Sequence, residues 1–331
     1  MIGPLRIQNF KSIRDLKFNA RRVNLFIGEP NVGKSNILEA LSLLSPRALE
    51  SLGDIVRFAT VPDLFFDQDT KLTIRVWADN LRLAIARLGA GFQGEIREGG
   101  KDTLCGFSLD HSRVTGSGGV GLGRPDNIRC YKFKAIHQFV DAHPELLHAP
   151  FGDNIVAVLY ANPELRRRIG GLVRTKGFRL QLKPTESQLL VTKDINDELY
   201  SYPWVTVSET LRRVVFFMTA METNREAALL LDEPETCVFP FYTKYLADRI
   251  AQEESNQYFI TTHNPYLLSN IVEKTAAKDL AVFVVRMENC ETGVKQVPES
   301  NIPELLRPDA DSFVNFDRLV VEETRSGVTL K

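Results

Sequence analysis

Residues 25–44, LFIGEPNVGKSNILEALSLL, constrain the fold more than any other part of this 331-residue chain. An apolar run typical of a buried strand leads into the pattern G-x-x-x-x-G-K-[ST] at residues 28–35, and apolar residues at helical spacing follow. Glycines at these positions let backbone N–H groups turn toward phosphate oxygens, and the next helix adds its positive end. The segment therefore predicts a strand, a phosphate-binding loop and a helix, with a chance glycine turn as the alternative.

The residues of this loop have predicted roles in binding a nucleoside triphosphate with Mg²⁺. Lys34 supplies a cation for the β- and γ-phosphates, and the Ser35 hydroxyl is a predicted ligand of Mg²⁺. The other nucleotide contacts in the loop are expected from Gly28, Asn31, Gly33 and Asn36.

Two later apolar segments end in polar residues that suit ATP hydrolysis. AALLLDEPE places Asp232 and Glu233 after a buried strand, and QYFITTHNP places His263 after another. Because the carboxyl ends of parallel strands meet at one edge of a sheet, we expect these residues to gather beside Lys34. Asp232 is the predicted Mg²⁺ ligand, Glu233 the general base and His263 the sensor of the γ-phosphate. The alternatives are an acidic turn and a surface histidine, and the paired carboxylates favour ATP over GTP hydrolysis.

Strand and helix patterns alternate at both ends of the chain, whereas the middle is irregular. This organisation predicts a parallel α/β core that is split by an insertion. The expected parts are residues 1–70 with the phosphate loop, an inserted β and helical arm or lid over 71–200, and residues 201–331 with the carboxylates and the histidine.

The formal net charge of −1 means that any binding to nucleic acid must use a local patch. Basic residues concentrate in one segment of the middle region: Arg166, Arg167, Arg168, Arg174, Lys176, Arg179 and Lys183. Residues 166–183 can be interpreted as a patch for DNA or RNA phosphates, as a solvated helical face, or as a surface for a partner protein.

Nowhere do eighteen apolar residues run together, and the N-terminus MIGPLRIQNF lacks the apolar core of a signal peptide. The four cysteines are scattered without paired metal spacing. The sequence therefore predicts a cytoplasmic protein that does not enter a membrane.

LRIQNFKSI, the GKSN loop with ILEAL, LLLDEPE and TTHNP together resemble the ABC-class ATPases of the RecF, SMC and overcoming-lysogenization-defect (OLD) type. The resemblance covers residues 1–45 and 205–270. It implies an α/β P-loop NTPase head of ABC type, with an N-terminal β-hairpin and antiparallel sheet and an inserted mixed β and helical region. It also implies a homodimer in which two heads sandwich two ATP molecules, each head giving a signature segment to the other.

The signature segment corresponds by this resemblance to VSET at residues 207–210, where Ser208 would cap a helix and meet the partner's γ-phosphate. The alternative is a plain helix N-cap. The chain departs from the family pattern at Thr210, where glycine is usual, and at Phe239, where a histidine commonly precedes proline. Gln68 is the nearest candidate for the family's Mg²⁺-reaching glutamine, and Lys11 is placed beside the nucleotide by similarity.

The resulting hypothesis is a slow ATPase switch that dimerises around ATP and relays its state to nucleic acid or to a separate effector protein, as in DNA repair or phage defence. The alternatives are a non-hydrolysing, ATP-gated scaffold and a transporter ATPase subunit. OLD proteins continue into a TOPRIM nuclease, but LVVEE at residues 319–323 has Glu323 in place of the glycine and no DxD strand after it. We therefore expect no nuclease in this chain.

Overall fold

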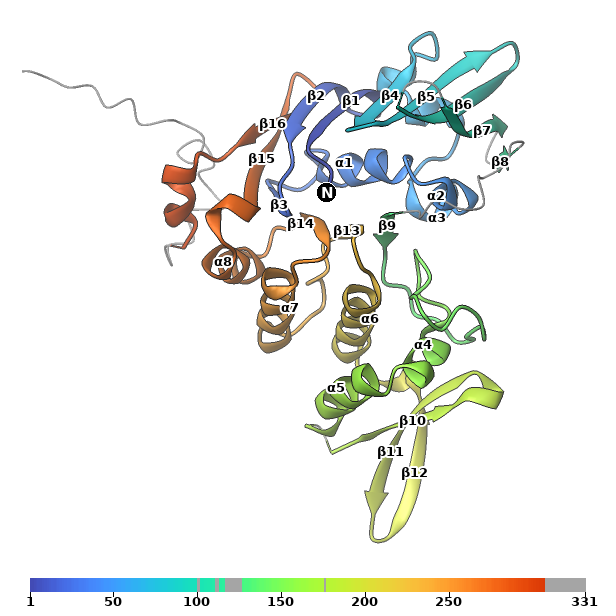
Figure 1. Ribbon diagram of the computed structural model, residues 1–331, viewed down its shortest axis with the longest axis vertical. Coiled ribbons are helices and arrows are strands. Elements are labelled where there is room, and N and C mark those ends of the chain that lie inside the picture. The colour runs from blue at the N-terminus through green and yellow to red at the C-terminus, as the bar shows by residue number, and fades with distance from the viewer. Residues whose placement is uncertain (100–101, 111–112, 117–126, 176, 307–331) are drawn as a thin grey trace, which may run out of the picture.

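The computed structural model describes residues 1–306 except 100–101, 111–112, 117–126 and 176 (Figure 1). The described strands form three sheets of six, seven and three strands. The C-terminal residues with Glu323 lie outside the described part of the chain. Among the described residues, no helix combines the length and the apolar character needed to cross a membrane.

The six-stranded sheet is the centre of the molecule, and its strand order is β16-β15-β3-β14-β13-β9. Its strands are β3 (Val23–Ile27), β9 (Ile128–Tyr131), β13 (Ala228–Asp232), β14 (Gln257–Thr261), β15 (Leu280–Glu288) and β16 (Glu291–Gln296). All neighbours pair in parallel except β16, which runs antiparallel to β15. Every residue of β3 and β14 is buried, which explains why apolar residues predominate in both strands. The predicted parallel α/β core is confirmed.

Helices cover both faces of this sheet (Figure 1). One face packs on α1 (Lys34–Ser42), and the other packs on α6 (Glu209–Thr223), α7 (Pro240–Gln252) and α8 (Pro265–Lys274). Successive residues of β13 serve the two sides, because Leu230 belongs to the core beside α1 whereas Leu229 and Leu231 belong to the core beside the other helices.

The seven-stranded antiparallel sheet lies over α1, with the strand order β2-β1-β4-β5-β6-β7-β8. Its strands are β1 (Pro4–Phe10), β2 (Ile13–Asn19), β4 (Ile74–Ala78), β5 (Leu81–Leu88), β6 (Gly91–Glu98), β7 (Asp102–Asp110) and β8 (Arg113–Gly116). Apolar residues on its inner face, such as Ile7 and Ile74, join the core of α1. The predicted N-terminal antiparallel sheet is confirmed.

Short helices connect the two sheets. They are α2 (Pro46–Glu50), α3 (Leu52–Ile55) and the 3₁₀ turns η1 (Val61–Leu64) and η2 (Phe66–Gln68). Other 3₁₀ turns are η3 (Pro184–Glu186), η4 (Trp204–Thr206), η5 (Ala277–Asp279) and η6 (Glu299–Leu306).

A separate arm projects from the core beside α6 (Figure 1). It contains α4 (Ile155–Ala161), α5 (Pro163–Arg174) and a three-stranded antiparallel sheet of β10 (Arg179–Lys183), β11 (Gln188–Ile195) and β12 (Glu198–Pro203). The expected single insertion over 71–200 is therefore divided in space. Strands β4 to β8 extend the N-terminal sheet, β9 joins the parallel core, and among the described residues only the elements from α4 to β12 form an arm.

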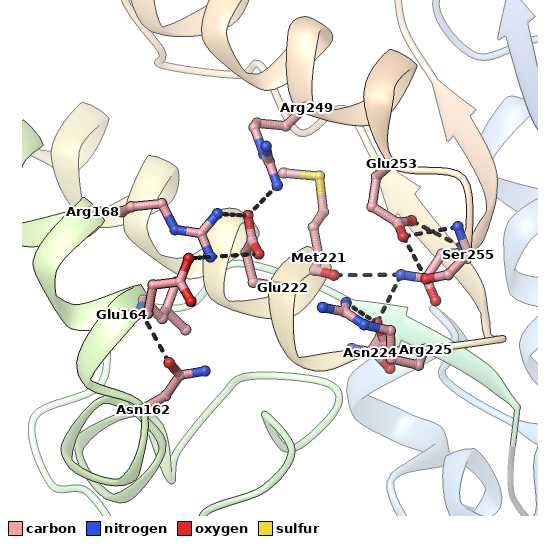
Figure 2. A network of polar contacts seen from close by, with 12 residues as sticks. Asn162, Glu164, Arg168, Met221, Glu222, Asn224, Arg225, Arg249, Glu253 and Ser255 are labelled. Carbon is pink, nitrogen blue, oxygen red and sulfur yellow. Dashed lines mark hydrogen bonds and ion pairs between the residues drawn. The ribbon is translucent and has the colours of Figure 1, made fainter.

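An ion-pair network joins the arm to the core helices (Figure 2). Glu222, in the last turn of α6, has a side chain only 7% exposed. Both of its carboxylate oxygens accept hydrogen bonds of 2.9 Å from Arg168 of α5, and one also pairs with Arg249 of α7. The buried carboxylate thus holds three helices together, and Arg168 is directed into the molecule.

We expect Glu222→Gln to lower the free energy of unfolding by about 3 kcal/mol, because the substitution breaks a buried, doubly paired carboxylate. Urea denaturation followed by tryptophan fluorescence measures the loss. Glu209→Gln, which removes a half-exposed partner of Arg213 on the same helix, is the matched control and should cost less than about 1 kcal/mol. Equal losses in the two variants would contradict the bridging role of Glu222.

Candidate functional site

The phosphate loop follows β3, and Lys34 begins α1. The Lys34 side chain is buried, and its Nζ donates to the carbonyls of Gly28 at 2.9 Å and Glu29 at 2.7 Å. Gly33 has a φ of 94°, and a Cβ at this position would lie 2.1 Å from the hydroxyl of Thr292. Only glycine therefore fits where the loop meets the β15–β16 hairpin.

Thr292 of β16 braces the phosphate loop from the far end of the chain. Its Oγ1 donates to the carbonyl of Val32 at 2.9 Å and lies 2.7 Å from the hydroxyl of Ser12. Its backbone N–H donates to the carbonyl of Ser12 at 2.7 Å. Asn36, a predicted nucleotide contact, donates its side-chain amide to Ser12 at 2.8 Å and so joins this brace. No sequence motif marks Thr292, because its partners are distant in the chain.

The predicted catalytic residues gather at the carboxyl edge of the parallel sheet. Ser35 donates its hydroxyl to Oδ1 of Asp232 at 3.0 Å, and Thr261 donates to the same oxygen. Nδ1 of His263 lies 3.1 Å from Oε1 of Glu233. The backbone N–H of Glu233 donates to the carbonyl and the hydroxyl oxygen of Thr261, each at 3.1 Å, which fixes the turn after β13.

Lys34 lies within electrostatic reach of this acidic edge. Burial lowers the pKa of Lys34, and the carboxylates of Glu233, Asp232 and Glu235 oppose that effect. The structure thus brings together the lysine of the loop and the carboxylates that end β13, although about two hundred residues of sequence separate them.

The donor set at Ser35 and Asp232 fits Mg²⁺. A hydroxyl oxygen and a carboxylate oxygen meet at 3.0 Å, and the Thr261 hydroxyl adjoins the same carboxylate. These hard oxygen ligands suit Mg²⁺, which usually takes one or two protein carboxylates together with substrate phosphates. Among the described residues, no group of three or more His, Cys, Asp or Glu side chains forms a metal cage of its own.

Glu235 is a buried acid that sequence reasoning did not separate from the preceding carboxylates. It is 4% exposed, and its Oε1 accepts a hydrogen bond of 2.5 Å from Thr262. Within the described residues its other oxygen has no hydrogen-bond partner. Burial raises the pKa of Glu235 to about 7. Thr262 accepts in turn from the N–H of Asn264 at 3.0 Å, so Glu235 supports the turn that carries His263.

A second charged cluster lies beside the carboxylates. Lys11 pairs with Glu39, which is only 2% exposed, and Arg57 donates to the other oxygen of Glu39 at 2.9 Å. Burial lowers the pKa of Arg57, and the carboxylates of Glu39, Asp232 and Glu233 more than reverse that effect. Arg57 is therefore a cation near the catalytic edge that no motif indicated. Lys11, a predicted nucleotide contact, lies beside Arg57 because both bind Glu39.

Two residues of the predicted signature segment make contacts within their own head. Ser208 is the exposed N-cap of α6, and its hydroxyl accepts from the N–H of Leu211 at 3.4 Å. Thr210 donates its hydroxyl to the carbonyl of Cys237 at 2.7 Å. The side chain that replaces the usual glycine is therefore bonded to the loop after β13.

The structure does not bring Gln68 to the other predicted site residues. Gln68 is exposed in η2, and its amide donates to Asp63 at 2.9 Å. The position beside Asp232 on the neighbouring strand belongs instead to Lys132, which follows the end of β9. The loop after β9 faces Asp232 because β9, and not a strand before Gln68, is the neighbour of β13 in the parallel sheet.

Comparison with known proteins fits this geometry. A family model described as "AAA ATPase domain" matches residues 1–80, and one described as "AAA domain, putative AbiEii toxin, Type IV TA system" matches residues 139–269. No curated protein matches the chain. An SMC head bound to the C-terminal winged-helix domain of ScpA is similar in fold at a TM-score of 0.52, with 12% identity over 89% of this chain and 97% of that one.

Two further SMC heads give lower TM-scores. The head domain from Thermotoga maritima has a TM-score of 0.43 and 14% identity, covering 90% of this chain and 99% of that one. The head with an extended coiled coil bound to the C-terminal domain of ScpA, derived from Pyrococcus furiosus, has a TM-score of 0.49 and 13% identity, covering 92% and 98%.

The fold, the phosphate loop and the two family models define an ABC-type P-loop ATPase. Within that class its fold is similar to that of an SMC head, which agrees with the type predicted from the sequence. An ATP-binding and ATP-hydrolysing protein follows from this class.

We expect Thr292→Ala to weaken ATP binding about tenfold, because the phosphate loop loses its brace to β16. Titration with a fluorescent ATP analogue measures the affinity. Thr292→Ser keeps the hydroxyl and should restore most of the binding. Unchanged affinity in Thr292→Ala would show that the brace does not position the loop.

Glu235 predicts a pH-dependent stability. Its folded pKa of about 7 lies above the ordinary 4.5, so its stabilising contribution is complete below pH 4.5 and is lost as pH rises through 7. Glu235→Gln cannot lose a proton, so its melting temperature relative to the parent should be higher by about 2 to 4 °C at pH 8 than at pH 5.

Thermal denaturation without nucleotide makes this comparison. The exposed Glu254 provides the control, because Glu254→Gln should show no such change with pH. A pH-independent difference for Glu235→Gln would rule out the titration of the buried carboxyl.

Proposed function

We propose that this chain is an ATP-driven switch in which two copies close around ATP and open after hydrolysis. The observation that carries the proposal is the convergence of Lys34 and Ser35 with Asp232, Glu233 and His263 at one edge of the parallel sheet. Residues placed in this way can bind a triphosphate, polarise water and respond to the γ-phosphate.

Each residue has a distinct role in this proposal. Lys34 exchanges the carbonyls of Gly28 and Glu29 for phosphate oxygens, with Gly33 and Asn31 shaping the loop around them. Ser35 and Asp232 would hold Mg²⁺, which neutralises phosphate charge when bound.

Glu233 accepts a proton from the attacking water and also orients the imidazole of His263. Nδ1 of His263 faces Glu233, so the other ring nitrogen is the one that reaches the γ-phosphate. The 3.1 Å contact thus couples the base to the sensor.

The same edge supports dimerisation. Ser208 is exposed at the start of α6, where backbone N–H groups attract an anion. Phe239, Phe241 and Tyr266 lie at the starts of α7 and α8 and are 65%, 64% and 60% exposed. Large exposed aromatics beside a polar site are typical of a protein interface. A second copy of the chain would cover them and complete the site.

The state of the switch passes to a partner in this proposal. Glu222 of α6 pairs with Arg168 of the arm and with Arg249 of α7. A movement of α6, which begins at the signature segment, is therefore transmitted to the arm. We propose a defence role with a separate effector protein, and the family model over residues 139–269, whose description names a type IV toxin–antitoxin system, supports a two-component system. We also propose a cytoplasmic location, because the proposed switch requires ATP.

Thr210 and Phe239 support a slow turnover, and they also keep the non-hydrolysing scaffold as a second candidate. The Thr210 hydroxyl donates a hydrogen bond to the carbonyl of Cys237. The glycine that is usual at this position has no side chain and leaves the backbone uncovered. A single-turnover assay separates the two functions, because intact ATP after hours of incubation would favour the scaffold.

We expect Glu233→Gln to reduce steady-state ATP turnover at least about a hundredfold, because the general base is lost. Its ATP-dependent dimer should persist, since the ATP contacts remain. Phosphate release and light scattering after size exclusion measure the two properties.

Glu254→Gln, at an exposed position outside the site, should behave as the parent in both assays. A Glu233→Gln protein that stays monomeric in saturating ATP would contradict the ATP-sandwich dimer. Undiminished turnover would contradict the role of Glu233.

A further inference from the structure

Basic and aromatic residues form one row across the outer face of the seven-stranded sheet, opposite the face that packs on α1. The register pairs Arg6 with Lys17 and with Trp77, then Trp77 with Arg82, and Arg82 with Arg97. We call this set the cation row: Lys17, Arg6, Trp77, Arg82 and Arg97. It crosses β2, β1, β4, β5 and β6 and contains no acidic residue.

The members of the cation row point to solvent because each has at least one buried neighbour along its strand, and successive side chains of a strand face opposite sides of the sheet. Lys17, Arg82 and Arg97 are exposed, whereas Arg6 and Trp77 are half-buried. The guanidinium of Arg6 lies 5.3 Å from the centre of the Trp77 ring. An aromatic ring is therefore placed among four cations in one line.

The adjacent row holds the carboxylates that orient two of these cations. Asp15 accepts two hydrogen bonds from Arg6, at 2.8 and 2.7 Å, and Glu95 accepts one from Arg97 at 2.8 Å. In the described part of the chain, Lys17 and Arg82 form no ion pair. The middle and one end of the cation row thus keep unpaired positive charge.

This arrangement opposes the stability of the sheet. Like charges directly opposite each other on neighbouring strands are destabilising, and the row contains two such pairs, Arg6 with Lys17 and Arg82 with Arg97, in each of which a carboxylate of the adjacent row compensates only one cation. An anionic ligand on this face would relieve the repulsion.

The basic segment predicted from sequence, residues 166–183, uses three of its cations in contacts within the chain. Arg168 is committed to Glu222, Arg166 donates to the carbonyls of Leu159 and Tyr160, and Lys183 pairs with Glu186. Lys176 lies outside the described residues. Arg167, Arg174 and Arg179 of this segment are exposed and, within the described residues, form no ion pair, but none of them lies over an aromatic ring as Arg6 lies over Trp77.

We propose that the cation row binds single-stranded nucleic acid, with Lys17, Arg82 and their neighbours on the phosphates and Trp77 against a base. The proposal names a partner for the proposed switch, and it uses no residue of the ATP site. Charge along a line together with an aromatic platform is the chemistry that single strands require.

The dimensions suit a short stretch of strand. Neighbouring strands of a sheet lie about 4.8 Å apart, so the row from Lys17 to Arg97 extends about 19 Å. Arg6, Lys17 and Trp77 also line an open hollow of about 470 Å³ beside the row, together with Asn19 and Asp79. This hollow offers room for a base next to the Trp77 ring.

Fluorescence anisotropy with a labelled twenty-nucleotide oligo-dT tests the proposal on the full chain. The Lys17→Gln/Arg82→Gln double variant removes two charges from the row, and Arg167→Gln/Arg174→Gln removes two from α5. We expect the first to bind about tenfold more weakly than the parent at 0.1 M salt, with a salt slope lower by about 1.4, and the second to bind as the parent does.

A fluorescent ATP analogue is titrated into the same preparations, because normal ATP binding shows that the variants are folded. Failure of the proposed switch would appear in ATP turnover, and failure of the row in anisotropy. Parental affinity in the row variant, equal losses in both variants, or no binding of oligo-dT by the parent would overturn the proposal. Competition by polyglutamate but not by unlabelled oligo-dT would also overturn it, in favour of an acidic protein partner.

Discussion

The parallel pairing of β3 with β14, and of β14 with β13, is the constraint on which the site depends. It brings the ends of three strands to one edge, so that Ser35 reaches Asp232 at 3.0 Å and His263 reaches Glu233 at 3.1 Å. Neither contact could be made by local structure alone. The two faces of the sheet are closed by separate apolar cores, and the edge that remains between them is where polar groups can meet a ligand.

Much of this edge could be predicted from sequence, because each motif ties a functional side chain to the end of an apolar strand. Lys34, Asp232 and His263 are brought together on that basis. The roles of Thr292 and Arg57 could not be predicted from sequence, because they depend on contacts with residues far away in the chain and no sequence motif surrounds either residue. Gln68 is the expected glutamine of a loop after the first core strands, but strand order gives the place beside Asp232 to the segment after β9.

The middle of the chain shows the limit of composition as a guide. A cluster of arginines in the sequence is not a cluster of free charges, since Arg168 lies against the buried Glu222. The cation row is the opposite case: its members are dispersed in the sequence among five strands, and the register of the sheet brings them side by side. Alternation along each strand shows which residues face solvent, but it does not show which of them are neighbours.

The brace between Ser12, the phosphate loop and Thr292 ties together residues that are 280 positions apart. During synthesis the amino-terminal hairpin and the phosphate loop emerge first, and β16 emerges last among the described strands. Closing so long a loop is entropically costly and is repaid only when the whole parallel sheet has assembled. The nucleotide-binding loop therefore gains its final support only after β16 has been synthesised, and a chain on the ribosome that still lacks β16 has no fully braced site.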